Sequence, residues 1–247
     1  MEIELVLLFF GVALLYATAG FGGGSSYLAI MALFGLSMLT LRPVALLCNI
    51  VVVSGNLWIF WQNGHLNLKK TAPLALAGIP MAFAGGYWRL SEQTFFILLG
   101  ISLIAAAFAM WIQSRPLSQQ SNQTKTLPVA ANLSIGGSLG LLAGLTGIGG
   151  GIFLSPVLHL IRWDKPKVIA AAASFFIFCQ SIAGISGQLA QGAKIEWNLV
   201  FPLLIAVWLG GQIGVRATAS RFSQVLVRNL TALLVLYAGF NILWRYL

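Results

Sequence analysis

Residues 20–24 read Gly-Phe-Gly-Gly-Gly, and residues 147–151 read Gly-Ile-Gly-Gly-Gly, 127 positions further along the chain. At an offset of 125, Val44–Ala45 matches Ile169–Ala170, and a two-residue change in the intervening loop accounts for the difference. Self-similarity at a fixed spacing indicates a structural repeat. We therefore predict that the chain consists of two related halves, each with one glycine block near its start.

The apolar segments around the glycine blocks follow the same order in both halves. A polar stretch at 113–128 separates the two sets of segments, and its composition is typical of a linker. We predict a first membrane repeat over residues 1–113, a cytoplasmic linker over 114–128 and a second membrane repeat over 129–247. The apolar segments lie at about 5–19, 25–38, 43–62, 71–88, 94–112, 130–145, 152–162, 167–188, 197–215 and 223–244.

The composition places the protein in a membrane. Of its 247 residues, 59% are apolar and 8% are charged, whereas roughly 25% of an average soluble domain is charged. Five acidic and fourteen basic residues cannot cover the surface of a soluble protein of this size, but helices surrounded by lipid need no such surface. The basic residues that give the net charge of +9 are scattered between the apolar segments, which excludes a nucleic-acid-binding groove.

Metal and cofactor binding are not expected. Cys48 and Cys179 both lie inside apolar segments, and no cluster of further ligands accompanies either of them. We therefore predict no disulfide, no metal site and no cofactor.

The first two segments of each half are too short to cross a bilayer upright. At about 1.5 Å per residue, about 15 residues reach about 22 Å, less than the roughly 30 Å hydrocarbon core. Each pair is either two tilted short spans or a re-entrant hairpin, whose turn must be buried in protein or face a wet cavity. The predicted fold is an all-α integral membrane protein with two inverted repeats, each a short broken or re-entrant helix hairpin followed by three transmembrane helices.

Basic loops predict the orientation, because Lys and Arg accumulate on the cytoplasmic side. Such loops occur at 69–70, in the linker, at 162–167 and at 216–221. With all four in the cytoplasm, the two halves are inverted relative to each other. The predicted location is the bacterial inner membrane, with both termini periplasmic.

The glycine blocks have the chemistry of an oxyanion site. A helix is expected to begin directly after each block, so its first amides have no intrahelical partner and its dipole points its positive end at the turn. Glycine lets an anion approach the backbone closely, and two serines add hydroxyl donors in the first half. The alternative is that these glycines only let helices pack closely. The predicted substrate-binding residues of the blocks are Gly22, Gly23, Gly24, Ser25, Ser26, Gly149, Gly150 and Gly151.

Polar residues recur every seven positions in the third segment of each half, nearly on one helical face. Two matching stripes favour a polar path between the halves, whereas hydrogen bonding that only joins helices is the alternative. We assign the path to Asn49, Asn56, Ser174 and Ser181. The outermost members, Asn63 and Gln188, are interpreted as interfacial.

The charged residues favour an anionic substrate. Glu92, Asp164 and Glu196 all fall in predicted loops, so no carboxylate relay is expected within the membrane. Arg42 and Lys167 occupy equivalent positions at the starts of their segments. We interpret both as ordinary loop charges, the alternative being that they draw anions toward the path.

One string suggests an enzyme. Gly184-Ile185-Ser186-Gly187 resembles the nucleophile motif of rhomboid proteases, which also needs a membrane-embedded histidine downstream. His65 and His159 both lie upstream of it. We therefore interpret the string as small-residue helix packing and predict no catalytic residue.

Residues 19–24 (AGFGGG), 144–151 (GLTGIGGG) and 155–158 (SPVL) give the chain a wider resemblance. On these motifs, its length and its central linker, it resembles the sulfite exporter TauE/SafE family over essentially its whole length. One departure is Ala29, which stands in the first half where the second has Pro156. The resemblance implies transport of sulfite, thiosulfate or small organosulfonates across the inner membrane, usually as export.

We therefore expect a secondary transporter that exports a small sulfur-containing anion, with a passive anion channel as the alternative. The expected partners are the anionic substrate and the lipid bilayer, without nucleic acid. Homo-oligomerisation is left open.

Overall fold

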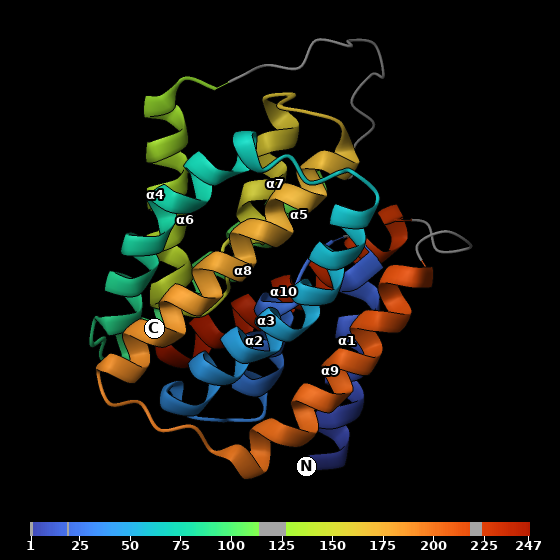
Figure 1. The fold of residues 1–247 in the computed structure, drawn as a ribbon. Helices are drawn as coiled ribbons and strands as arrows, with labels where there is room; N and C mark the ends of the chain where they lie inside the picture. The colour runs from blue at the N-terminus through green and yellow to red at the C-terminus, as the bar shows by residue number, and fades with distance from the viewer. Residues whose placement is uncertain (1, 19, 114–126, 218–223) are drawn as a thin grey trace.

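The computed structural model describes residues 2–18, 20–113, 127–217 and 224–247, and within these ranges it is all-helical, without strands. Each predicted apolar segment corresponds to one helix, and most of the predicted linker lies outside the described residues. The ten helices of the described ranges (Figure 1) are α1 (Glu2–Thr18), α2 (Gly24–Leu33), α3 (Met38–Gln62), α4 (Leu68–Tyr87), α5 (Glu92–Gln113), α6 (Val129–Thr146), α7 (Gly151–Leu160), α8 (Pro166–Ala190), α9 (Trp197–Ala217) and α10 (Gln224–Tyr246).

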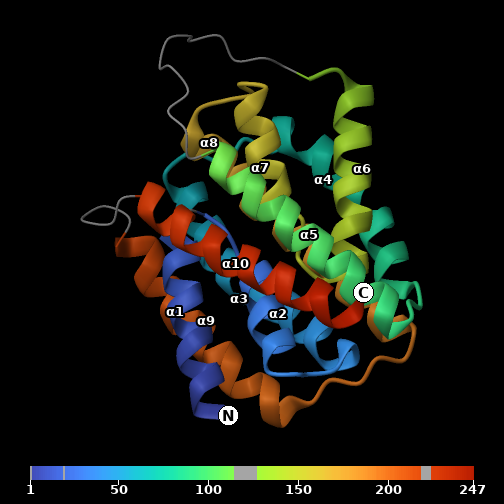
Figure 2. The same ribbon diagram turned by 180° about the vertical axis from the view of Figure 1, so that it is seen from behind.

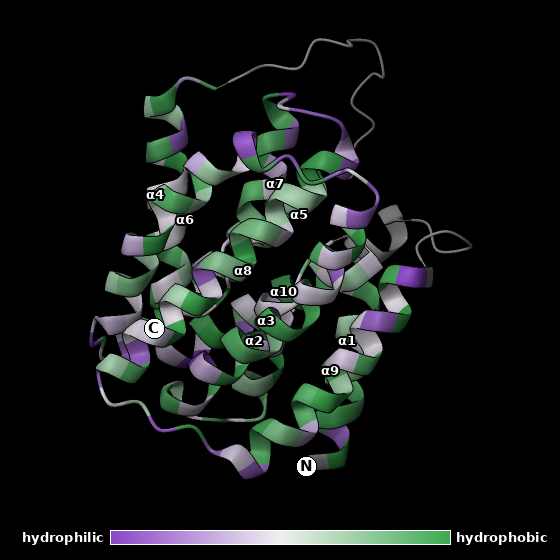
Figure 3. Cartoon of the chain, viewed as in Figure 1, coloured by the Kyte–Doolittle hydropathy of each residue, from purple (hydrophilic) through white to green (hydrophobic). Residues whose placement is uncertain are grey.

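The helices have the length and composition of a membrane protein. Within the described part of the chain, five helices are long and apolar enough to cross a membrane: α3, α5, α6, α8 and α9. Figure 3 shows apolar residues along most of the helices, with many of the most hydrophilic residues at loops and helix ends. The prediction of an all-helical membrane protein is confirmed.

The short helices α2 and α7 have 10 residues each. At about 1.5 Å per residue each is about 15 Å long, about half the thickness of the hydrocarbon core. Neither is therefore long enough to cross the membrane, and each follows a longer helix of its own half through a glycine turn.

Helices from the two halves are interleaved. α1 lies along α9, α4 lies along α6, and α5 lies along α10 (Figures 1 and 2). α3 and α8 pack against each other in the middle, where α3 also contacts α9 and α8 also contacts α4. The contacts come in matching pairs, because the first helix of each half packs on the fourth helix of the other.

Glycines outside the two blocks let these helices approach closely. Gly136, Gly140 and Gly144 recur every four residues along α6, and a Cβ on any of them would collide with the backbone of α4. Gly210 and Gly214 of α9 face the backbone of α1 in the same way. Small residues have this role in lipid, where close van der Waals packing joins helices.

Candidate functional site: two glycine turns

Both glycine blocks form tight turns that are covered by protein. The backbone has positive φ at Gly20 (80°) and Gly23 (88°) in the first turn, and at Gly147, Gly149 and Gly150 in the second. Glycine adopts this conformation without the steric cost that a side chain brings. All residues of 20–24 and 147–151 are buried, as a turn at membrane depth requires.

A helix begins directly after each turn, as predicted. Gly23 is the N-cap of α2 and Gly150 is the N-cap of α7, and no side chain hydrogen-bonds to either helix start. Apart from the Phe153 amide, which donates to the carbonyl of Gly150 at 3.2 Å, the first amides of both helices are therefore available to a ligand, at the positive ends of the two helix dipoles.

Asn49 of α3 lies between the two turns. Its Nδ2 donates to the carbonyl of Ile148 at 3.1 Å, and a Cβ placed on Gly149 would come within 2.7 Å of the same nitrogen. The side chain also touches the first turn, because a Cβ on Gly22 or Gly24 would collide with it. The structure thus brings the glycine blocks of both halves against one buried amide, whose Oδ1 has no partner.

The other predicted path residues also contact the turns. Asn56 Nδ2 donates to the carbonyl of Phe21 at 3.4 Å, and Ser174 Oγ of α8 donates to that of Gly20 at 2.5 Å. Ser181 Oγ is buried without a partner, and a Cβ on Gly149 would lie 3.3 Å from it. Each turn is therefore contacted by α3 and by α8.

The family profile described as sulfite exporter TauE/SafE matches residues 5–242. The chain belongs to the TauE/SafE family. A "probable membrane transporter protein" of Sinorhizobium fredii is 32% identical over 98% of both chains. A protein of the same description from Xylella fastidiosa is 25% identical over 93% of this chain and 91% of its own.

"Sulfite exporter TauE/SafE family protein 6" of Arabidopsis thaliana is 29% identical over 59% of this chain and 36% of its own. No solved structure shows a significant match. The protein is thus a membrane transporter of the TauE/SafE family, and the family relation is to transporters rather than to enzymes.

In this TauE/SafE protein, the two predicted serine donors are buried beside a tyrosine of α1. The hydroxyl of Tyr16 lies 2.7 Å from Ser26 Oγ and 3.3 Å from Ser25 Oγ. Tyr16 was not predicted as a site residue, because a single tyrosine in an apolar segment has no periodic partner to mark it. Tyr27 of α2 was not predicted either; its buried hydroxyl has no partner and lies against Gly23.

The interpretation of Arg42 as a loop charge is wrong. Arg42 lies within α3 and is 4% exposed, and its Nη2 donates to the carbonyls of Gly144 at 2.9 Å and Gly85 at 3.2 Å. Lys167, the equivalent residue of the second half, is exposed. The two positions differ because the ends of α4 and α6 pack over Arg42, whereas Lys167 lies in the first turn of α8 beside the α7–α8 loop.

The two outer stripe residues, which were interpreted as interfacial, differ in their exposure. Asn63 is exposed and donates to the carbonyl of Ile59 in its own helix at 2.7 Å. Gln188 is 2% exposed, and its Nε2 has no partner. The buried part of the stripes therefore extends further toward the end of α8 than toward the end of α3.

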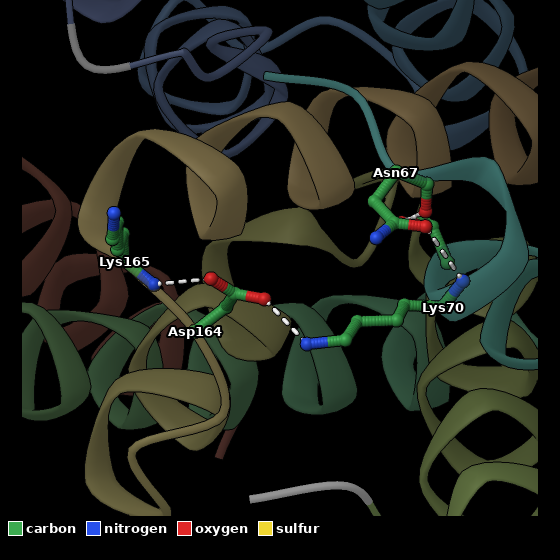
Figure 4. Close-up of polar contacts among 5 residues, drawn as sticks. Asn67, Lys70, Asp164 and Lys165 are labelled. Carbon is green, nitrogen blue, oxygen red and sulfur yellow. Dashed lines mark hydrogen bonds and ion pairs between the residues drawn. The ribbon is translucent and has the colours of Figure 1, made fainter. Parts of the chain in front are cut away.

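An ion pair connects the two halves at the start of α4. Lys70 Nζ and Asp164 Oδ2 form an ion pair at 2.7 Å (Figure 4), and Lys70 Nζ lies 5.6 Å from the centre of the Trp163 ring. Burial alone would raise the pKa of Asp164, but hydrogen bonds from Lys70 and from the Lys165 amide hold this pKa below its ordinary value. The pair joins the start of α4 to the α7–α8 loop, so it connects the two halves.

No cluster of metal ligands accompanies the turns. Among the described residues, no group of three or more His, Cys, Asp or Glu side chains lies together. Cys48 and Cys179 are both free thiols. Ser186 of the rhomboid-like string donates to the carbonyl of Ile182 in its own helix at 2.8 Å.

Proposed function

We propose that this TauE/SafE transporter exports a small sulfur-containing anion, of the sulfite, thiosulfate or organosulfonate class, and binds it where the two glycine turns meet. One observation carries the proposal: two uncapped helix starts, one from each half, converge on Asn49 in the buried interior. All five acidic residues of the sequence lie at helix ends or in loops, away from this point.

The donors at the turns suit an oxyanion. Free amides at a helix start and the positive end of the helix dipole both favour negative charge, and absent Cβ atoms allow an oxygen to reach the backbone. Two such starts from opposite sides can surround a small tetrahedral or pyramidal ion. Binding requires the side chain of Asn49 to swing from Ile148, since it now fills the space between the turns.

The proposed architecture is a pair of inverted repeats whose relative motion opens the site alternately to the two sides of the membrane. The matching cross-half contacts, α1 with α9 and α6 with α4, support it. So do two contacts at corresponding places: Lys70 near the start of α4 pairs with Asp164, and Glu196 before α9 accepts from Thr40 at 3.3 Å. Inverted repeats with broken helices typically bind substrate near the midplane and alternate around it.

The proposed location is the bacterial inner membrane, with both termini in the periplasm. The basic loops at 69–70 and 162–167 support this orientation. The ion pair between Lys70 and Asp164 then lies on the cytoplasmic face, and the contact between Thr40 and Glu196 lies on the periplasmic face.

Binding to the purified protein tests the substrate class. Sulfite, thiosulfate, sulfoacetate, sulfate and chloride are compared at equal ionic strength by thermal denaturation in detergent. A ligand at about 100 times its Kd stabilises the folded state by about 2.7 kcal/mol. We expect one or more sulfur anions to raise the Tm and chloride to leave it unchanged; equal shifts for every anion, or none, would remove the sulfur assignment.

Flux through proteoliposomes distinguishes the carrier from the passive channel. A carrier shows saturable flux and accelerated exchange when unlabelled substrate is present on the other side of the membrane. Flux that rises linearly with concentration, without such exchange, would establish the channel instead.

A further inference from the structure

Arg42 is a cation buried in the interior of a protein whose acidic residues are few and peripheral. Its side chain is 4% exposed, and its recorded contacts are three carbonyl oxygens and the ring of Phe95, 5.8 Å away. No described carboxylate contacts it. A charged side chain within the membrane is costly and is typically retained where it has a function.

The carbonyls satisfy only part of the guanidinium. All three hydrogen bonds come from Nη2, and they reach the last turns of α4 and α6, where helix dipoles are negative. Nε is buried and has no partner. A guanidinium presents five N–H donors in a fixed plane, so its remaining edge can still bind an oxyanion.

The position of Arg42 relates it to the glycine turns. Arg42, Asn49 and Asn56 are spaced by seven residues, so they share one face of α3. The backbone of Arg42 lies against the second turn, because a Cβ on Gly147 would be 3.3 Å from its Cα. The polar stripe of α3 thus begins with a positive charge beside this turn.

A hollow in the surface lies where α4 and α8 end. It has a volume of about 560 Å³ and is lined by Ala84, Tyr87, Trp88, Arg89, Ala190 and Gln191. Ala84 and Tyr87 flank Gly85 and Gly86 in α4.

We propose that Arg42 is the charge-selecting residue of the transporter: its Nε–H binds the substrate oxyanion beside the second glycine turn, while Nη2 remains on the carbonyls of α4 and α6. This inference rests on the proposed transport of an anion and deepens it. The glycine turns supply directional but uncharged donors, and Arg42 supplies the positive charge that favours a divalent over a monovalent anion.

Arg42→Gln tests the charge, and Lys167→Gln is the matched control, because it removes the same charge from the equivalent exposed position. Affinities for divalent thiosulfate and monovalent methanesulfonate are measured by thermal shift with full-length protein in detergent. We expect Arg42→Gln to weaken thiosulfate binding at least tenfold and methanesulfonate binding less, and Lys167→Gln to match the wild type. An equal loss for both anions, or no loss, would overturn the role of Arg42.

Arg42→Lys provides a second test if Arg42→Gln does not fold. Lysine keeps the charge and can still donate to the carbonyls, but it lacks the Nε–H edge. We expect it to retain the preference for thiosulfate while binding both anions several-fold more weakly. Unchanged affinities in Arg42→Lys would overturn the proposal. If the wild type binds neither anion, the proposed function fails as well; if it binds and the Arg42 variants match it, only the role of Arg42 fails.

Discussion

At Gly24, the first residue of α2, the space for a side chain is already occupied. A Cβ there would lie 2.6 Å from the carbonyl of Ile148, in the other half of the chain, and would collide with the amide of Asn49. The backbone at Gly24 does not have positive φ, so the requirement for glycine comes from the close approach of the two turns. Because Gly24 has a hydrogen where alanine has a methyl group, the two turns can come into contact.

Gly24→Ala is expected to destabilise the protein by about 1–3 kcal/mol, because overpacking a filled interior forces neighbouring groups to shift. The measurement is thermal denaturation in detergent. Gly11→Ala is the control: a Cβ on Gly11 of α1 meets nothing within 4 Å, so it should be neutral or slightly stabilising, by up to about 1 kcal/mol. Similar effects of the two variants would contradict the close contact of the turns.

The free energy of unfolding is expected to depend on pH through Asp164. Its pKa is lowered in the folded state, so the contribution of its carboxylate is present above the ordinary value of about 4 and is lost as the pH falls through the folded pKa. Asp164→Asn should cost about 1 kcal/mol at neutral pH, or about 2–4 °C in Tm for a chain of this size.

The measurement is the Tm of both proteins between neutral and acidic pH. Their difference should shrink as the pH falls, because the wild type then loses the same ion pair with Lys70. A difference that stays constant with pH would show that the charge of Asp164 is not responsible.

Among the elements, α3 and α8 show what sequence pattern can and cannot predict. Spacing by seven placed Asn49 and Ser174 on inward faces, because the period of a helix is a local property of the chain. The repeat register placed Arg42 and Lys167 at equivalent positions, although one is buried and the other exposed. Burial depends on which other helices pack there, and that information is not contained in the spacing.

The glycine turns were predictable for a similar reason. Blocks of three consecutive glycines between apolar segments favour a break between helices, so the starts of α2 and α7 followed from the sequence. The repetition of the block suggested that the two turns face each other, but the place of Asn49 between them did not follow, because it depends on how α3 crosses both turns. The places of Tyr16 and Tyr27 beside the first turn were not predicted, because neither residue belongs to a repeated pattern.

Asn49→Ala is expected to loosen the contact between α3 and the second turn. It leaves the buried carbonyl of Ile148 without its donor, which costs about 1–3 kcal/mol. Asn63→Ala in the same stripe is the control, because Asn63 is exposed and bonds only within its own helix; we expect a change within about 0.5 kcal/mol. Denaturation midpoints of the two variants check this, and equal midpoints would argue against a junction at Asn49.

In the whole molecule, the helix packing between the two halves is more extensive than the packing within either half. α1 packs mainly on α9, and α4 packs mainly on α6 and α8. The surfaces that Gly136, Gly140 and Gly144 create on α6 are complementary to α4 of the first half. The predicted linker at 114–128 thus divides the sequence into two halves, but most helix packing joins one half to the other.

Cutting the chain within residues 114–126 at an inserted protease site should therefore leave the halves bound to each other. We expect the cleaved protein to elute in mild detergent at the position of the intact protein, with a Tm lowered by only a few degrees. An inserted site in the α3–α4 loop is the control for cleavage that interrupts one half. Separation of the halves after cleavage in the linker would contradict the interleaved packing.

The pairing of α1 with α9 also implies a delay during synthesis between the first helix and its partner. After Thr18 has left the ribosome, about 180 residues must be added before Trp197 begins the partner helix. At about 5–20 residues per second, this takes about 10–35 s. During that interval, the faces of α1, α3 and α4 that pack on the second half have no partner helix. We therefore expect the insertion machinery or chaperones to cover these faces until the second half has been synthesised.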